Sequence, residues 1–252
     1  MKVLQILPQL NIGGVERGTL DLSKALINKG YESFVISGGG ILVDELTQNG
    51  AKHYEIPVHI KSLRTLSLAK RLSEIISTID PDIVHVRSRM PAWVNYRAFK
   101  KLQKKPLLIS TFHGLYSFPV YSKVMSFVDH SIAISKTVEN YILENYKLDK
   151  ADISVIPRGC DPIEFNNDLI NPADKANIIK EFPQVVGKKV LTIPGRITKW
   201  KGVAEFIELL SLLDDNYHGL IVGPTAKSKK KYLNKLQDKV SSLDLKDKIT
   251  FT

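Results

Sequence analysis

The sequence has one cysteine, Cys160, among its 252 residues. A single cysteine forms neither an internal disulfide nor a multi-cysteine zinc site, which excludes a disulfide-stapled scaffold and favours a reducing, cytoplasmic compartment. Long apolar runs are also missing, since no stretch approaches the roughly 18 to 20 residues of a membrane-spanning helix. Gln5 and Pro8 interrupt the apolar opening before a signal-peptide core could form, so this segment predicts a first strand.

The common nucleotide-binding motifs are absent as well. The first predicted turn carries Gly13, Gly14 and Gly18, a spacing that departs from G-x-G-x-x-G, and no acidic residue ends the second predicted strand. NAD binding is therefore disfavoured, and without a P-loop lysine nucleoside triphosphate hydrolysis has no support. The histidines show no metal-ligand spacing, so no metal site is expected. His85, inside the apolar run IVHV, is expected to pack within a strand.

Acidic residues are outnumbered by basic ones, 26 against 36, and the net charge is +10. The excess is clustered: residues 61–105 hold eleven Lys or Arg and three acids, and residues 225–252 hold eight Lys and three Asp. Such clusters fit an anionic partner, such as a lipid headgroup or a sugar nucleotide, or plain solvated helix faces. Aromatic residues are not interleaved with them in a recognition motif, so nucleic acid is not an expected partner.

Short apolar strands alternate with longer amphipathic segments, which is typical of an α/β fold with a parallel sheet covered by helices. The first seven predicted strands are Val3–Leu7, Ser33–Ile36, Lys52–Ile56, Ile83–Val86, Leu107–Thr111, His130–Ile134 and Ile153–Ile156. The helices predicted between them are Glu16–Lys29, Leu66–Ile79, Pro91–Gln103 and Lys136–Tyr146, the last with Ser135 as N-cap. Together they predict one complete, doubly wound Rossmann-like domain.

A second domain is predicted to begin after a polar connection. The first domain is expected at residues 1–165, the connection at 166–187 and an incomplete second Rossmann-like domain at 188–252. The second domain's predicted elements are strands Lys189–Ile193, Tyr217–Val222 and Lys248–Thr252 and helices Val203–Leu213 and Ser228–Val240. Three strands bury too little surface to make a comfortable independent domain.

Three turns carry residues suited to chemistry. Gly13 and Gly14 precede a helix, where a ligand can approach the backbone and the first amides can face an anion, although a glycine pair is also common in ordinary tight turns. His113, in STFHG after the fifth strand, is positioned to donate a hydrogen bond or to move a proton, or simply to bond a loop carbonyl. In PGRITKWKG, Arg196 and Lys201 flank a strand-to-helix turn that suits a diphosphate.

These motifs, taken in their order along the chain, resemble those of a known protein family. The segments GGVER, DIVHVRSRMPAWVNY, STFHG, ISVIPRGCDPIEF and PGRITKWKG together resemble family 4 glycosyltransferases of the GT-B fold. Within that family, HVRSRMPAW and YSKVMS are most similar to bacterial enzymes that build lipopolysaccharide core or related cell-surface glycans. The resemblance implies two facing Rossmann-like domains, one for the acceptor and one for the nucleotide sugar. It further implies retaining transfer from a nucleotide-diphosphate sugar to a glycan or lipid-linked acceptor, with no metal or cofactor.

The resemblance also implies roles for single residues. On the acceptor side, the glycine loop and the reactive centre would be formed by Gly13, Gly14, Glu16 and His113. On the donor side, the diphosphate would be held by Gly195, Arg196 and Lys201. Asp161, in RGCD, matches an aspartate in a turn before the interdomain hinge. Gly223 lies in a loop that commonly lines the nucleotide pocket, and an ordinary turn is the alternative reading of it.

The sequence departs from the family pattern at its end. Family members continue past ITFT into a segment with a pair of glutamates that contact the donor, and nothing follows Thr252 here. We therefore expect a truncated chain, or one completed by a second chain, with little turnover by itself. A non-catalytic module that binds sugar nucleotides or glycans is the alternative. Basic helices near Arg64–Arg71 and Arg97–Lys105 are expected to rest on the inner face of an anionic membrane.

Overall fold

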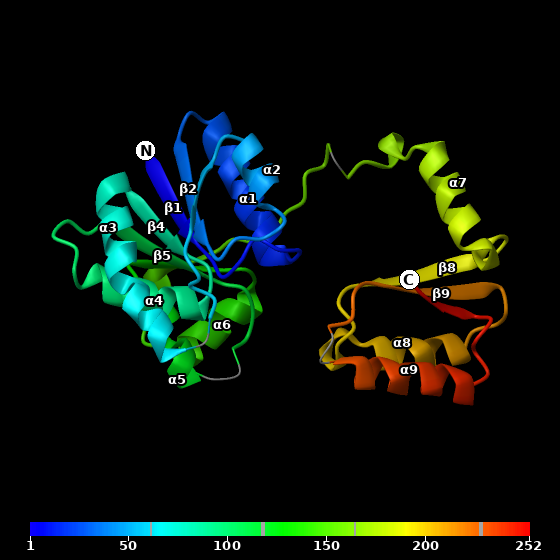
Figure 1. Ribbon diagram of the computed structural model, residues 1–252. Coiled ribbons are helices and arrows are strands. Elements are labelled where there is room, and N and C mark those ends of the chain that lie inside the picture. Colours follow the sequence, from blue (N-terminus) through cyan, green and yellow to red (C-terminus); the bar gives the residue numbers. More distant parts are fainter. Residues whose placement is uncertain (61, 117–118, 164, 227–228) are drawn as a thin grey trace. The chain divides into compact units, whose positions relative to one another are not determined.

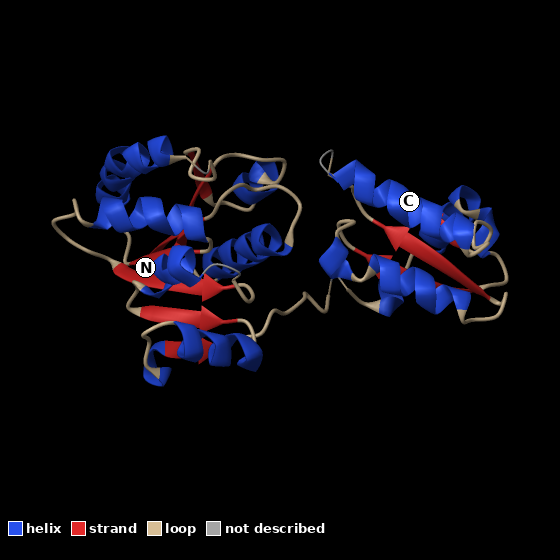
Figure 2. Ribbon diagram, turned by 90° about the horizontal axis from the view of Figure 1, so that it is seen from below, coloured by secondary structure: helices blue, strands red, loops and turns tan. Residues whose placement is uncertain are grey.

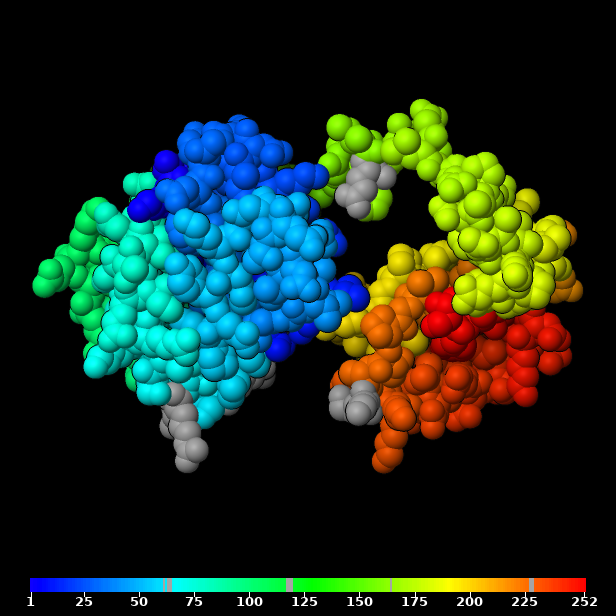
Figure 3. Space-filling model, turned by 45° about the horizontal axis from the view of Figure 1, so that its top comes forward, coloured from blue at the N-terminus to red at the C-terminus, as the bar shows by residue number. Residues whose placement is uncertain are grey.

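The computed structural model describes residues 1–60, 62–116, 119–163, 165–226 and 229–252. Two residues of the sequence motifs, Glu164 and Ser228, lie outside the described residues. The chain forms two compact units, Met1–Gly159 and Cys160–Thr252. They follow each other along the colour gradient of the space-filling view, the first from blue to green and the second from yellow-green to red (Figure 3).

The first unit is built on a parallel sheet of seven strands in the order β3-β2-β1-β4-β5-β6-β7. Its strands are β1 Lys2–Ile6, β2 Glu32–Ser37, β3 Lys52–Glu55, β4 Ile83–Val86, β5 Leu107–Phe112, β6 His130–Ala133 and β7 Ile153–Val155. All seven predicted strands are confirmed, with ends that shift by one residue at most. His85 packs within β4 as expected, because it is 2% exposed and its Nε2 lies 2.7 Å from the hydroxyl of Thr111.

Helices lie on both faces of this sheet (Figures 1 and 2). They are α1 Gly14–Asn28, α2 Val43–Gln48, α3 Ala69–Ile79, α4 Arg89–Phe99, α5 Pro119–Ser122 and α6 Lys136–Asn145, with 3-10 turns η1 Leu63–Leu68, η2 Lys123–Ser126 and η3 Lys150–Asp152. The cap of α6 is confirmed, since the hydroxyl of Ser135 accepts a hydrogen bond from Val138 N–H at 3.2 Å. The short helices α2 and α5 had not been predicted.

The two faces of the sheet bury different side chains because successive residues of a strand point to opposite sides. On one face, Val35 of β2 packs with Leu20 of α1 and Leu46 of α2. On the other, Leu4 of β1 packs in the cluster that contains Leu72 of α3 and residues of α4 and α6. Because β1, β4 and β5 are parallel neighbours, their carboxyl ends lie side by side at one edge of the sheet.

The second unit has a three-stranded parallel sheet in the order β10-β9-β8. Its elements are η4 Asn167–Leu169, α7 Pro172–Glu181, η5 Pro183–Val185, β8 Lys189–Pro194, η6 Lys199–Lys201, α8 Val203–Ser211, β9 Tyr217–Val222, α9 Lys230–Ser242 and β10 Ile249–Phe251. Apolar residues of α8 and α9, including Ile207 and Leu236, form one core with Ile221 of β9. The predicted α/β class with a second Rossmann-like sheet is confirmed.

The predicted connection, residues 166–187, contains the helix α7. Asn171 caps it by accepting a hydrogen bond from Ala173 N–H at 2.9 Å, and Pro172 occupies its first turn. No residue of α7 is buried, so its sequence lacks the apolar stripe by which a helix is predicted. Among the described residues, the helices are all too short or too polar to cross a bilayer.

Candidate active site

The first predicted site lies where β1 leads into α1. Gly13 precedes the helix, and its φ of 173° is extended backbone that any residue adopts. The missing side chain of Gly13 leaves the space that the carboxylate of Glu16 occupies, since a Cβ atom on Gly13 would displace that carboxylate. Glu16 therefore folds back over Gly13 in the first turn, where a carboxylate interacts favourably with the helix dipole. The structure places Gly13, Gly14 and Glu16 in one turn.

Arg158, which sequence reasoning missed, lies against the same helix. A Cβ atom on Gly18 would be 2.5 Å from both terminal guanidinium nitrogens of Arg158, and one on Gly14 would be 3.7 Å from Nη2. The guanidinium therefore fills a groove left open by two glycines four residues apart on one helix face. It makes no hydrogen bond or ion pair with any residue that the structure describes.

Arg87, also missed, directly follows β4 and is only 4% exposed. Its Nη1 donates a hydrogen bond to Oε1 of Gln5 at 2.8 Å, and its Nε has no partner among the described residues. Burial, followed by the charge of Arg158, lowers the pKa of Arg87 to about 10. The side chain is therefore still protonated at neutral pH, and the edge of the sheet holds a buried positive charge.

His113 follows β5 at the same edge. Its Nε2 is buried and has no hydrogen-bond partner within the described ranges, so this atom is not bonded to a loop carbonyl there. Burial, then the charges of Arg87 and Arg158, lower the pKa of His113 to about 3. The ring is neutral at physiological pH, which suits it to hydrogen bonding rather than to moving a proton near pH 7.

The predicted donor residues lie in the second unit, in the turn from β8 to α8. Gly195 and Gly223 have φ values of +144° and +142°. They bring the loops after β8 and β9 into backbone contact, because a Cβ atom on Gly223 would be 2.7 Å from the carbonyl carbon of Gly195. Gly195 N–H also donates to the carbonyl of Val222 at 2.8 Å. These contacts fix the backbone at the carboxyl edge of the second sheet.

Arg196 and Lys201 are exposed in this turn. The stem of Lys201 passes 3.7 Å from where a Cβ atom on Gly195 would lie, and its Nζ lies 4.4 Å from the ring centroid of Trp200. In the described part of the chain, neither cation forms an ion pair. The turn leads through Gly202 into α8, whose first amides add partial positive charge. The arrangement suits a diphosphate.

Asp161 has a local contact. Its Oδ1 accepts a hydrogen bond from Ile163 N–H at 2.9 Å, and this closes a turn at the start of the second unit. The carboxylate is exposed, as is the neighbouring Cys160. Its predicted role before a hinge stays a prediction.

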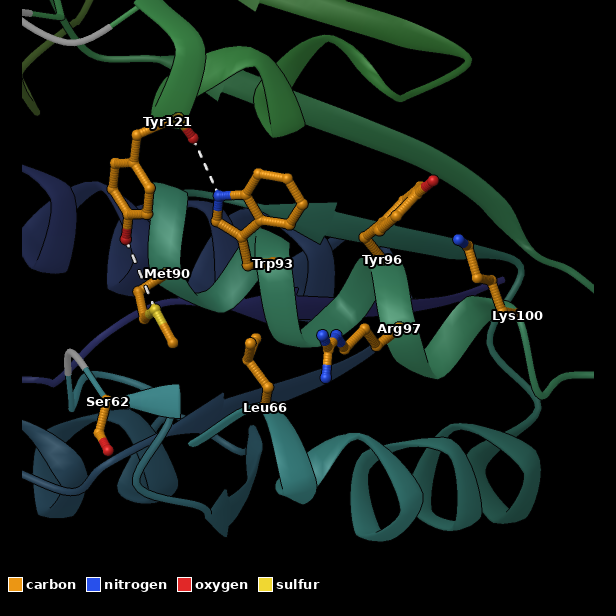
Figure 4. Close-up of a pocket in the computed structure, with 8 residues that line it drawn as sticks. All are labelled: Ser62, Leu66, Met90, Trp93, Tyr96, Arg97, Lys100 and Tyr121. Atoms are coloured by element: carbon orange, nitrogen blue, oxygen red, sulfur yellow. Dashed lines mark hydrogen bonds between the residues drawn. The ribbon is translucent and has the colours of Figure 1, made fainter. Parts of the chain in front are cut away.

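A pocket of about 640 Å³ lies between α4 and η1 in the first unit. Figure 4 shows Trp93, Tyr96, Arg97 and Lys100 along α4, with Leu66 opposite them. The indole N–H of Trp93 donates to the backbone carbonyl of Tyr121 at 2.9 Å, and Lys100 Nζ lies 4.3 Å from the ring centroid of Tyr96. The walls are mostly apolar, and both cations lie toward the carboxyl end of α4. Sequence reasoning found the charges but not the pocket.

Two protein-family models match the chain. The model described as Glycosyltransferase Family 4 matches residues 12–164, and the model described as Glycosyl transferases group 1 matches residues 174–252. An uncharacterized glycosyltransferase of Methanocaldococcus jannaschii is 32% identical over 148 residues, which cover 52% of this chain. The chain aligns with 36% of that protein's length and with 42% of a second curated relative.

Solved structures of similar fold cover the whole chain. The crystal structure of a glycosyltransferase from Rickettsia africae has a TM-score of 0.84 and 33% sequence identity, and 67% of it is covered. HepE of Anabaena, solved in complex with UDP and glucose, has a TM-score of 0.81 and 18% identity, and 68% of it is covered. At 18% identity, the similarity to HepE is a similarity of fold alone.

Proposed function

Because the chain belongs to Glycosyltransferase Family 4, we propose that it acts in the transfer of a sugar from a nucleoside-diphosphate donor to an acceptor hydroxyl. The observation that carries the proposal is the turn from β8 to α8, where Arg196, Lys201 and a helix N-terminus lie at the end of one strand. A departing nucleoside diphosphate gains negative charge at its bridging oxygen. Fixed cations at that oxygen stabilise the charge without a metal.

The first unit would hold the acceptor, and the resemblance gives His113 a place near the transferred sugar. His113 is neutral and has a buried Nε2 without a partner among the described residues, so it can form a hydrogen bond to a hydroxyl of the transferred sugar. UDP is the first nucleotide to test, since HepE has a similar fold and was solved with UDP. The proposal also includes retention of the anomeric configuration and a lipopolysaccharide-type acceptor. Both rest on the sequence resemblance to family 4 enzymes.

Calorimetric titration of the 252-residue chain tests the donor part of this proposal. We expect UDP and UDP-glucose to bind, and uridine to bind at least about tenfold more weakly because it lacks the diphosphate that the cations recognise. Binding is the first readout because it requires no acceptor. GDP- and ADP-sugars form the second series. Failure of every nucleoside diphosphate to bind, or equal binding of uridine, would contradict the proposal.

The pocket beside α4 supports a further part of the proposal, contact with an anionic membrane surface. Trp93 and Tyr96 combine an apolar body with a polar edge, which suits the boundary between headgroups and acyl chains. Lys100, Lys101 and Lys105 are exposed at or after the end of α4, where they can meet anionic headgroups. The apolar pocket and its basic end thus form one amphipathic surface.

Charge reversal separates this surface from the other basic cluster. We expect the triple variant Lys100→Glu, Lys101→Glu, Lys105→Glu to bind vesicles of phosphatidylglycerol and phosphatidylcholine about tenfold more weakly or worse in a flotation assay. Lys104 is left intact because its Nζ pairs with Asp80 at 2.8 Å. The matched control reverses three lysines of the second unit, which are Lys230, Lys231 and Lys235. Equal binding of the triple variant and the native chain would refute membrane contact through α4.

A further inference from the structure

Two arginines and a histidine of the first unit gather at one edge of its sheet. Arg87 follows β4 and His113 follows β5. Arg158 comes after β7, and its guanidinium packs against α1, the helix that follows β1. The strands β1, β4 and β5 are neighbours in the sheet. The strand order reverses between β1 and β4, and open α/β sheets bind ligands at the carboxyl edge of this point.

Burying the Arg87 side chain at this position costs free energy. A buried guanidinium loses several kcal/mol of hydration, and a carboxylate partner ordinarily offsets the loss. Arg87 has instead one hydrogen bond to the neutral amide of Gln5, and its Nε is left without a partner in the described part of the molecule. A buried polar atom without a partner calls for an explanation, and a bound anion would provide one.

Nearby carboxylates do not neutralise the cluster. Asp21 and Glu16 raise the pKa of Arg87, but less than burial and Arg158 lower it. Neither carboxylate forms an ion pair with Arg87 or Arg158 among the residues described. Glu16 lies over Gly13 instead. Burial, and then the charges of both arginines, lower the pKa of His113 and keep its ring neutral.

We propose that Arg87, Arg158 and His113 form a binding site for a phosphate-type oxyanion. The site rests on the proposed function and names the chemistry of a ligand: either a phosphate carried by the acceptor or the diphosphate of the donor. The guanidinium groups supply charge-assisted hydrogen bonds, and the neutral imidazole supplies one more. Gly14 and Gly18 are positioning residues, because their missing side chains leave the groove in which the Arg158 guanidinium lies.

Methyl phosphate is the probe for this site, titrated into the 252-residue chain and followed by calorimetry and by the ring resonances of His113. Arg158→Ala removes the exposed guanidinium. Gly18→Ala displaces it and leaves its charge in the chain, and alanine favours the helix by about 1 kcal/mol, so the fold is kept. We expect both variants to bind methyl phosphate at least about tenfold more weakly. Lys24→Ala, which removes an exposed cation of α1 to which no role is assigned, is the control and should bind as the native chain does.

The two sources of the oxyanion are separated by saturating the chain with UDP first. Methyl phosphate that still binds assigns the site to the acceptor, whereas displacement by UDP, with weaker UDP binding in Arg158→Ala, assigns it to the donor. A native chain that binds no methyl phosphate, or native-like binding by both Arg158→Ala and Gly18→Ala, overturns the site. Failure of the proposed function has a different signature, which is methyl phosphate binding by a chain that binds no nucleoside diphosphate.

Discussion

Replacing Arg196 and Lys201 together by alanine is expected to weaken UDP binding at least about 150-fold. Each cation would make a charge-assisted hydrogen bond to the diphosphate, worth about 1.5–3 kcal/mol, and two such losses exceed about 3 kcal/mol. Both side chains are exposed and lie outside the core of the second unit, so the fold should be unaffected. Calorimetric titration of UDP into the two chains measures the difference.

A nearby lysine provides the matched control for this double variant. Lys199 lies in the same turn and is exposed, and no role in binding is assigned to it. Lys199→Ala should therefore keep UDP affinity within about threefold of the native value, a loss limited to long-range charge. Arg196→Lys retains the charge and loses the planar fork, so its affinity should be intermediate. An unchanged affinity in the double variant would remove the β8–α8 turn from the donor site.

Gly223→Ala is expected to destabilise the second unit strongly and to abolish UDP binding. The backbone of Gly223 has a φ of +142°, and a side chain there costs about 1–3 kcal/mol in strain alone. The new methyl group would also overlap the carbonyl of Gly195, which cannot move without opening the turn that carries Arg196. We expect the free energy of unfolding to fall by about 3 kcal/mol and UDP binding to be lost, as measured by urea denaturation and calorimetry.

Gly187→Ala separates these two causes. Gly187 has a φ of +73°, and a Cβ atom there would meet nothing within 4 Å. This variant of the same unit should lose only about 1 kcal/mol, the ordinary cost of a left-handed alanine, and bind UDP normally. If Gly223→Ala is no more harmful than Gly187→Ala, the contact between the two loops has no part in shaping the donor site.

The strands were predictable because the buried parallel sheet needs short apolar runs, such as IVHV in β4, that stand out from their polar surroundings. The start of α3 was less visible: the apolar pattern continues through the 3-10 turn η1, so the predicted helix began at Leu66 and the observed one begins at Ala69. The helix α7 had no such signal because it buries none of its residues.

Ligands of α/β folds bind at the carboxyl ends of the strands. The glycines and cations next to predicted strand ends could therefore be singled out from the sequence. Arg158 was missed because its contact with α1 joins residues more than a hundred positions apart, and only the fold places them together. The spacing of Gly14 and Gly18, four residues apart on one helix face, was the available signal. For Arg87 the available signal was its position as a charged residue directly after a buried strand.

Mapping UDP onto the chain by amide resonances tests the central claim most directly, because it locates the nucleotide without requiring turnover. The account predicts saturable shifts centred on Gly195, Arg196, Lys201 and Gly202, with Gly223 in the loop beside them, and their loss in the double alanine variant. Shifts centred on the pocket beside α4, or no saturable shifts with UDP or any other nucleoside diphosphate, would contradict a donor site in the turn from β8 to α8.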